Sequence, residues 1–230
     1  MQSVKTFRKT LVLAALAAVP MTAAHAASQL DVYYTPYTLL KGDSDSGSVK
    51  FDNGDGYGAK GRFGLIDNVF ASLEYERNTY DSISINGTGI FVPDSKIRDK
   101  TEGYRGGIGY MVPTTPFYVE GEYIRLDNKQ KITFDNGGAA ESNNDTNEGW
   151  GAHLGAQGKV LSDYITLNAE IGYVDVGGGD GLEVLGGLAF NVTQNLGVFA
   201  DYRLTSLTGG GDNNPATRIE EARVGARLTF

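Results

Sequence analysis

Apolar and polar residues alternate along most of the chain after residue 27, and a period of two predicts β-strands. The last stretch shows the pattern most clearly, because Val224, Ala226, Leu228 and Phe230 alternate with charged or small residues up to the C-terminus. A strand that is apolar on one face, charged on the other and closed by an aromatic residue is typical of a membrane barrel with lipid outside and polar groups inside. The pattern therefore predicts strands that cross a membrane.

The same alternation predicts ten strands, an even number, as single-chain bacterial barrels have. Five of them are predicted at about 30–40, 57–66, 182–190, 196–203 and 223–230. Three more begin near residues 69, 117 and 165, and two end near residues 112 and 160. Eight strands remain the alternative if one hairpin is miscounted. The predicted fold class is all-β, a transmembrane antiparallel up-and-down β-barrel.

Connections between these strands alternate in length. Short turns are predicted at Asp67, Pro113, Ser162 and Gln194, with mostly longer loops between them. Short turns are typical of the periplasmic side and longer loops of the cell exterior, so both termini are expected in the periplasm.

Two hairpins are predicted to be taller than a membrane requires. Alternation continues through residues 82–85 and through 131–134, and an Asn-Gly turn signal follows each stretch. We therefore expect the third to sixth strands to project from the outer leaflet as one raised sheet. Disordered loops are the alternative, especially over 139–147.

The N-terminus has the features of a secretory signal. Lys5, Arg8 and Lys9 precede a short apolar run at 11–19, and Ala24-His25-Ala26 offers a small-x-small cleavage pattern. The run is too short to span a bilayer, which disfavours an N-terminal anchor. We predict a cleaved signal peptide at 1–26 and a barrel domain at 27–230.

Composition excludes several classes of protein. The chain has 20 Lys and Arg against 28 Asp and Glu, a net charge of −8, which argues against a nucleic-acid partner. It has no Cys, so it offers no disulfide and no thiolate metal site. It also has no apolar run of transmembrane-helix length, and its 32 Gly residues suit turns and barrel bends.

With these features in place, the chain resembles the small outer-membrane barrels of the OmpA-transmembrane, OmpX/Ail and opacity-protein superfamily. The specific element is the ending Val224, Ala226, Leu228 and Phe230, which looks like the signal read by the barrel-assembly machinery. The resemblance implies location in the outer membrane of a Gram-negative cell. Ten strands would depart from the eight of those families, so no specific activity is carried over.

The inward face of the predicted barrel carries many charges of both signs, and buried charges require partners. The predicted lumen charge network comprises Lys60, Arg62, Glu74, Glu76, Arg105, Glu120, Glu122, Lys159, Glu170, Asp201, Arg203, Arg223 and Arg227. We expect these residues to close most of the lumen. A narrow conducting path is the alternative.

Catalytic chemistry is not indicated. The ten-stranded omptin proteases share the predicted strand count, but they need a His and acidic groups near the outer rim. Here His153 is the only His after the signal, it lies within a strand, and no motif accompanies it. We predict a structural place for His153 in the polar lumen, no enzyme, and no metal or cofactor.

The outer loops suggest contacts with the cell surface. Asp43, Asp45, Asp52 and Asp55 lack the spacing of an EF-hand and are expected to be solvated, with weak cation bridging to lipopolysaccharide as the alternative. Arg77 and Arg125 point outward near the external strand ends and are predicted to contact lipopolysaccharide phosphates.

Taken together, the sequence predicts a monomeric outer-membrane barrel that acts as a structural and adhesion-type protein. Its expected partners are membrane lipid, lipopolysaccharide, the assembly machinery and an extracellular partner bound by the third to sixth strands. A porin-like channel for ions or small solutes is the alternative function.

Overall fold

The structure is a computed structural model, and it describes residues 28–44, 47–80, 82–86, 95–134, 141–160, 164–209 and 216–230. The predicted signal peptide at 1–26 lies outside these residues, as do the predicted turn at Ser162 and most of the Asn-Gly turns. The side chains of Asp43, Asp45 and Asp52 also fall outside the described part.

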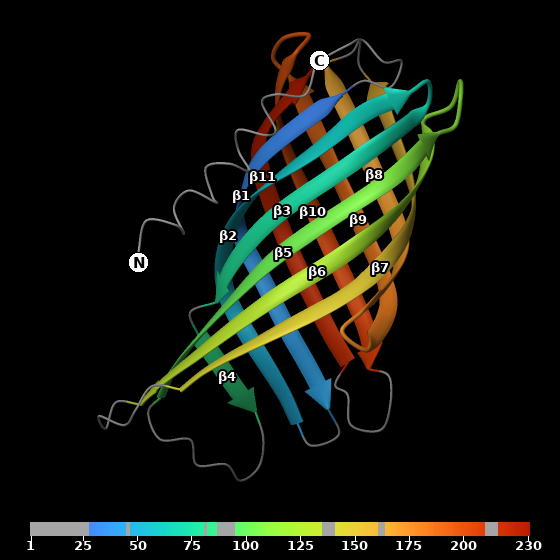
Figure 1. The fold of residues 1–230 in the computed structure, drawn as a ribbon. Helices are drawn as coiled ribbons and strands as arrows, with labels where there is room; N and C mark the ends of the chain where they lie inside the picture. Colours follow the sequence, from blue (N-terminus) through green and yellow to red (C-terminus); the bar gives the residue numbers. More distant parts are fainter. Residues whose placement is uncertain are drawn as a thin grey trace, which may run out of the picture.

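Ten antiparallel strands close into a barrel, which confirms the predicted fold (Figure 1). The barrel strands are β1 (Gln29–Ser44), β2 (Gly47–Ile66), β3 (Val69–Tyr80), β5 (Ser95–Met111), β6 (Phe117–Phe134), β7 (Glu141–Val160), β8 (Ile165–Val176), β9 (Gly179–Asn191), β10 (Leu196–Gly209) and β11 (Ala216–Thr229). An additional short strand, β4 (Ser82–Asn86), pairs with β2. β1 pairs with both β2 and β11, so the sheet has no edge along the barrel wall.

Alternation decides which face each residue takes. Along β3, for example, the even-numbered residues are buried in the lumen and the odd-numbered ones are more exposed. Large apolar residues such as Leu73, Ile108 and Leu154 are more than half exposed on the outer surface. Lipid would cover such a surface in a membrane. No helix among the described residues has the length and hydropathy of a membrane span.

The two ends of the barrel differ. We call the end that holds Ser28 and Phe230 the proximal end, and the opposite end the distal end; the proximal end is at the top of Figure 1. Tight turns follow Ile66 and Met111 at the proximal end, as predicted, and Asp67 takes a φ of 45° there. At the distal end, Gly177 and Gly178 adopt φ of 64° and 79° and form a tight turn from β8 to β9.

The distal extensions differ from the predicted single raised sheet. β5, β6 and β7 do stay paired far beyond the rest of the barrel, up to Ser95↔Phe134 and Ile132↔Glu141. The continuation of β3, however, pairs with β2 and not with β5 (Figure 1). β3 and β5 last pair at Tyr80↔Asp99, and no strand pairing joins their distal continuations among the described residues. The described residues therefore form two separate extensions, and the expectation of one sheet was wrong.

Candidate functional site: the charged lumen

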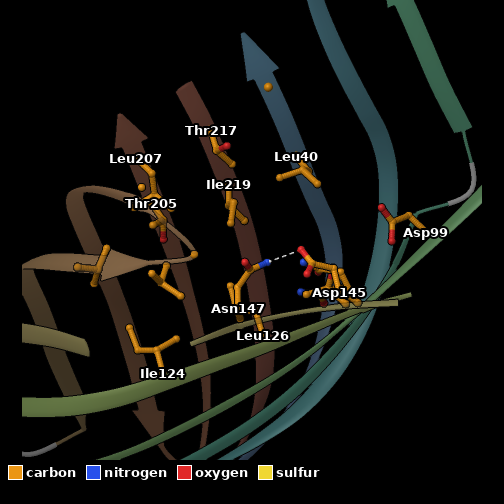
Figure 2. Close-up of a pocket in the computed structure, with 18 of the residues that line it drawn as sticks. Leu40, Asp99, Ile124, Leu126, Asp145, Asn147, Thr205, Leu207, Thr217 and Ile219 are labelled. Carbon is orange, nitrogen blue, oxygen red and sulfur yellow. Dashed lines mark hydrogen bonds between the residues drawn. The ribbon is translucent and has the colours of Figure 1, made fainter. Parts of the chain in front are cut away.

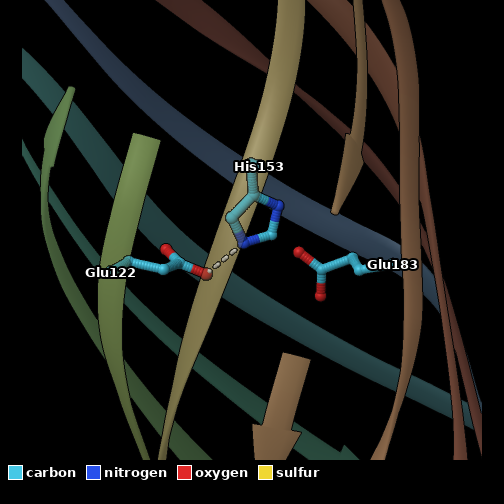
Figure 3. Close-up of side chains that lie close together, drawn as sticks. All are labelled: Glu122, His153 and Glu183. Carbon is cyan, nitrogen blue, oxygen red and sulfur yellow. Dashed lines mark hydrogen bonds and ion pairs between the residues drawn. The ribbon is translucent and has the colours of Figure 1, made fainter. Parts of the chain in front are cut away.

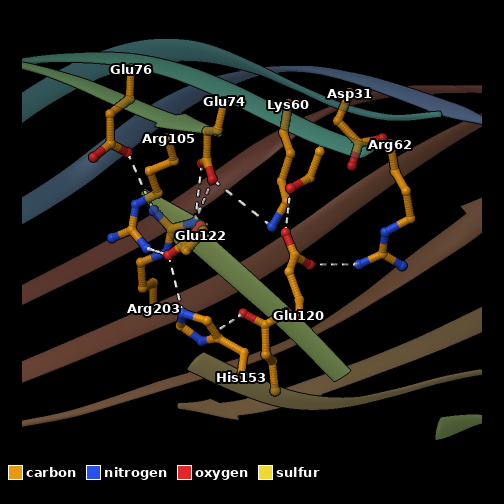
Figure 4. Close-up of polar contacts among 12 residues, drawn as sticks. Asp31, Lys60, Arg62, Glu74, Glu76, Arg105, Glu120, Glu122, His153 and Arg203 are labelled. Atoms are coloured by element: carbon orange, nitrogen blue, oxygen red, sulfur yellow. Dashed lines mark hydrogen bonds and ion pairs between the residues drawn. The ribbon is translucent and has the colours of Figure 1, made fainter. Parts of the chain in front are cut away.

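The middle of the lumen is built around Glu74 of β3, whose side chain points inward because it occupies a buried position of the alternating strand. Arg203 of β10 donates through Nη2 to both carboxylate oxygens of Glu74, at 3.1 and 2.8 Å. Lys60 of β2 approaches the same carboxylate at 3.8 Å. These contacts bring together residues from three strands (Figure 4).

Arg223 approaches Glu74 from β11, a strand that does not pair with β3. Its Nη1 donates to Glu74 Oε1 at 2.8 Å, and its Nε and Nη2 donate to Asp201 at 2.6 and 3.0 Å. The hydroxyl of Tyr33 also donates to Glu74, at 2.7 Å, and the Arg223 guanidinium lies 5.0 Å from the Tyr33 ring centroid. Arg223 is only 2% exposed. Every charge in this group therefore has an opposite partner, as buried charges require.

A second group surrounds Arg105 of β5. Its Nη1 donates to Glu122 and to Glu183, each at 2.8 Å, and its Nη2 donates to the other oxygen of Glu183. Thr205 completes the contacts of Glu183 with a hydrogen bond of 2.8 Å. A bidentate guanidinium–carboxylate pair of this kind is stronger and more directional than a simple ion pair.

His153 of β7 lies beside this group (Figure 3). Its Nε2 is 3.0 Å from Glu122, its Nδ1 is 3.4 Å from Glu170, and the ring is buried. Glu122, His153 and Glu183 bring three potential ligand atoms within 4.8 Å of one another, which is compatible with a metal ion. Both carboxylates already accept hydrogen bonds from Arg105, however, and a metal would have to displace that guanidinium. The geometry favours an ion-pair cluster.

Arginines at the proximal side of the lumen combine aromatic and carboxylate contacts. The Arg62 guanidinium lies 4.5 Å from the Phe70 ring centroid and 4.3 Å from that of Tyr118, and 3.8 Å separates it from Glu120. Ser72 donates a hydrogen bond to Glu120. Cation–π contacts of this type are strongest where water is excluded.

Nearer the proximal opening, Arg227 pairs with Asp31 through two hydrogen bonds of 2.9 Å. Most of the thirteen predicted network residues thus lie together in the lumen. Lys159 differs, because it is exposed and lines a cavity at the proximal opening.

Two sets of inward residues were not predicted from the sequence. One is the aromatic set that packs on the arginines: Tyr33, Phe70, Tyr118 and Phe199. The other is an aliphatic collar near the distal end: Ile124, Val174, Val176 and Leu207. Extending the alternation from Glu120 and Glu122 would have placed Ile124 inward. An apolar residue in a polar lumen is unexpected from the barrel pattern alone.

Two cavities lie on either side of the ion-pair layer. The distal one has a volume of about 480 Å³ and the proximal one about 770 Å³, and they share no lining residue. Between them lie the contacts of Glu74, Arg203 and Arg223.

The two arginines predicted to contact lipopolysaccharide lie on the outer surface, and each is close to carboxylates. Arg77 is 3.8 Å from Glu102, and Arg125 contacts Asp127 and Glu148.

Solved structures with the same fold come from several outer-membrane proteins. The translocator domain of the autotransporter NalP from Neisseria meningitidis has a TM-score of 0.54 and 15% identity, and covers 98% of this chain and 96% of its own. The outer membrane protease OmpT from Escherichia coli has a TM-score of 0.52 and 10% identity, covering 91% and 99%. Ail of Yersinia pestis has a TM-score of 0.46 and 14% identity, covering 88% and 99%.

At these identities the NalP and OmpT structures, whose TM-scores are above 0.5, establish the fold and no activity. No curated protein matches the chain in sequence. The model of the outer membrane protein beta-barrel domain family matches residues 11–184, which is more than half of the chain. The chain therefore belongs to this family of Gram-negative outer-membrane barrels.

Proposed function

We propose that this barrel does not conduct ions and that it acts through its distal end, as a structural and adhesion-type protein of the cell surface. The observation that carries the proposal is the ion-pair layer around Glu74, Arg203 and Arg223, which separates two cavities with no lining residue in common. Buried pairs of this quality resist opening, because breaking one leaves a charge without a partner. A closed lumen leaves the ends of the barrel as the functional surfaces.

The distal end is assigned to the cell exterior. Ser28 and Phe230, the first and last residues that the structure describes, lie at the proximal end together with two tight turns. Short turns are typical of the periplasmic side. The predicted signal peptide at 1–26 is consistent with export to this location. The chain has no Cys, so a single Cys introduced for Asn144 should react with an impermeant maleimide on intact cells. A Cys introduced for Thr193 should react only after lysis.

The extension formed by β6 and β7 supports a role in surface binding. β8 pairs with β7 only from Gly149 onward, and one further backbone hydrogen bond joins Gly177 to Glu148, so residues 143–147 of β7 present one unpaired backbone edge. These residues are mostly exposed and polar. An unpaired edge can accept a strand from another protein, with backbone hydrogen bonds supplying affinity. Lipopolysaccharide phosphates, approached by Arg77 and Arg125, are the proposed second partner.

A hydrolytic function is not favoured by the position of His153. The ring is 5% exposed, is held between Glu122 and Glu170, and lies within the lumen rather than at a rim that a polymeric substrate could reach. Similarity to the protease OmpT concerns the fold alone. We therefore propose that the chain is a binding protein and not an enzyme.

Single-channel recording tests the closed lumen directly. The protein, extracted in its folded form and reconstituted in a planar bilayer, should give no steady current while its heat-modifiable gel mobility confirms insertion. Steady current whose ion preference changes on neutralising Arg62 or Arg105 would instead establish the alternative, a narrow channel.

Adhesion is tested separately on cells. Deleting residues 133–144 should abolish binding of expressing cells to glass and to cultured host cells, with the barrel still folded. A matched Gly-Ser insertion between residues 193 and 194, at the proximal end, should leave binding unchanged. Unaltered binding after the deletion would exclude the tip of the β6–β7 extension as the binding surface.

A further inference from the structure

The distal cavity combines an aliphatic wall with an acidic floor. The wall includes the collar of Ile124, Val174, Val176 and Leu207, and Leu126 packs against it. Figure 2 shows Ile124, Leu126, Leu207 and Ile219 around one open space. Its volume of about 480 Å³ lies within the range of small-molecule sites.

The charged residues that line this cavity are mostly negative. They are Glu76, Asp99, Asp145, Glu183 and Glu221, against the single guanidinium of Arg105. Arg105 is already engaged in its bidentate pair with Glu183. The remaining carboxylates have no cation of their own among the lining residues, and the cavity therefore attracts positive charge.

Glu76 and Glu221 illustrate this shortage of positive charge. Both carboxylates approach the same nitrogen, Nη1 of Arg203, at 3.5 and 3.8 Å, and neither distance is that of a hydrogen bond. Nη1 has no hydrogen-bond partner in the structure. One guanidinium nitrogen thus serves two buried carboxylates, while Nη2 of Arg203 donates to Glu74 and Nε lies 3.9 Å from Glu183.

Asp99 provides an independent indication of a ligand site. Its side chain is 9% exposed, its Oδ1 has no hydrogen-bond partner, and it lines the cavity. Figure 2 shows the carboxylate directed from β5 toward the open space. A buried acceptor without a donor is unfavourable, and a donor supplied by a ligand would satisfy it.

From these observations we propose that the distal cavity binds a small organic cation, a primary ammonium group on a short aliphatic chain. The ammonium donates to Asp99 and is attracted by the carboxylates of Glu76 and Glu221, and the chain packs on Leu126 and Ile219. A bare metal ion would leave the aliphatic wall without a partner. The site does not depend on the adhesion function, since a cavity closed at its floor binds ligand whether or not the β6–β7 extension binds a surface.

Calorimetric titration of the folded full-length protein in detergent tests the proposal with probes of one chain length. Pentylamine should bind saturably, 1-pentanol at least ten-fold more weakly, and pentanoate not detectably. Equal binding of pentylamine and pentanol would overturn the role of charge. Tighter binding of Mg²⁺, in competition with pentylamine, would show an inorganic cation site instead.

Substitutions locate the site. Asp99→Asn and Glu76→Gln should each weaken pentylamine binding at least five-fold. Asp127→Asn is the matched control, because Asp127 lies on β6 between Leu126 and Asn128 but contacts Arg125 and Thr146 on the outer surface. Unchanged affinity in folded D99N would contradict the assignment.

A measurement on the unmodified protein avoids dependence on variants that fail to fold. Nuclear Overhauser effects should connect the pentyl protons of bound pentylamine with the methyl groups of Leu126 and Ile219. Their absence at saturating pentylamine would place the ligand elsewhere and overturn the proposal.

Discussion

Arg223 of β11 donates a hydrogen bond of 2.8 Å to Glu74 of β3, across 149 residues of sequence and between strands that are not neighbours in the barrel. Both side chains are almost completely buried. Because β3 and β11 are not neighbours in the sheet, this contact joins two non-adjacent parts of the barrel wall through the lumen. The stability of the barrel should therefore depend on lumen charges as well as on strand pairing.

Arg223→Met should lower the free energy of unfolding by about 3–5 kcal/mol, because Asp201 and Glu74 each lose a charged donor. Urea titration of the heat-modifiable form in detergent measures the change. Arg218→Met is the control on the same strand, because Arg218 pairs with Glu220 and its side chain is 54% exposed. Exposed pairs contribute only about 0–1 kcal/mol. Equal effects of the two substitutions would contradict a dry ion-pair layer.

Glu120→Gln combined with Glu122→Gln should destabilise the folded barrel by more than about 2 kcal/mol, because hydrogen bonds to charged groups are the stronger ones. Glu122 accepts from Arg105 and contacts His153, while Glu120 accepts from Ser72. The same unfolding titration applies. A double variant as stable as the parent would indicate a water-filled lumen.

Gly155→Ala should destabilise the barrel by about 1–3 kcal/mol, the usual cost of overpacking. A Cβ at this position would lie 2.1 Å from Cζ of Tyr118, whose ring is held by Arg62 and whose hydroxyl donates to Glu170. Gly121→Ala is the control, because a Cβ there meets nothing within 4 Å. Unfolding midpoints compare the two, and a neutral Gly155→Ala would mean that Tyr118 can move aside.

Phe230→Ala should reduce the fraction of protein that reaches the membrane folded. Phe230 and Ser28 exchange two backbone hydrogen bonds, and the Phe230 ring lies 6.5 Å from that of Phe63. The backbone bonds survive the substitution, so a loss of assembly with little loss of stability would indicate recognition of the aromatic ring. Gel mobility of membrane fractions measures assembly.

Phe190→Ala serves as the comparison, because Phe190 is an aromatic residue on the outer surface within β9. It should assemble normally. Equal assembly of the Phe230 and Phe190 variants would show that the C-terminal ring has no special role.

Local alternation predicted the strands and their faces well. Glu120, Glu122 and Arg105 lie inward as their positions in the period of two required, and ten strands form the barrel. Each of these features follows from neighbouring residues along one strand, because the period of two assigns faces without reference to the rest of the chain.

Partner choice across the lumen could not be predicted in the same way. Whether Arg223 meets Glu74 or Glu76 depends on the stagger of strands around the whole barrel, which no local pattern contains. The pairing of β4 with β2 was missed for a related reason: alternation in 82–86 predicts a strand but does not identify its neighbour.

Closure of β1 onto β11 has a consequence for how the molecule reaches its native state. Gln29 pairs with Thr229, so the final ring requires the two extremes of the domain to meet. Until they do, Glu74 has no Arg223 opposite it, and an open sheet would expose a row of charges and two strand edges. Intermediates in which the barrel has not closed are therefore unstable, and formation of the barrel should be close to all-or-none. Contacts of such long sequence separation also make folding slow, which leaves time for a carrier to deliver the unfolded chain to its membrane.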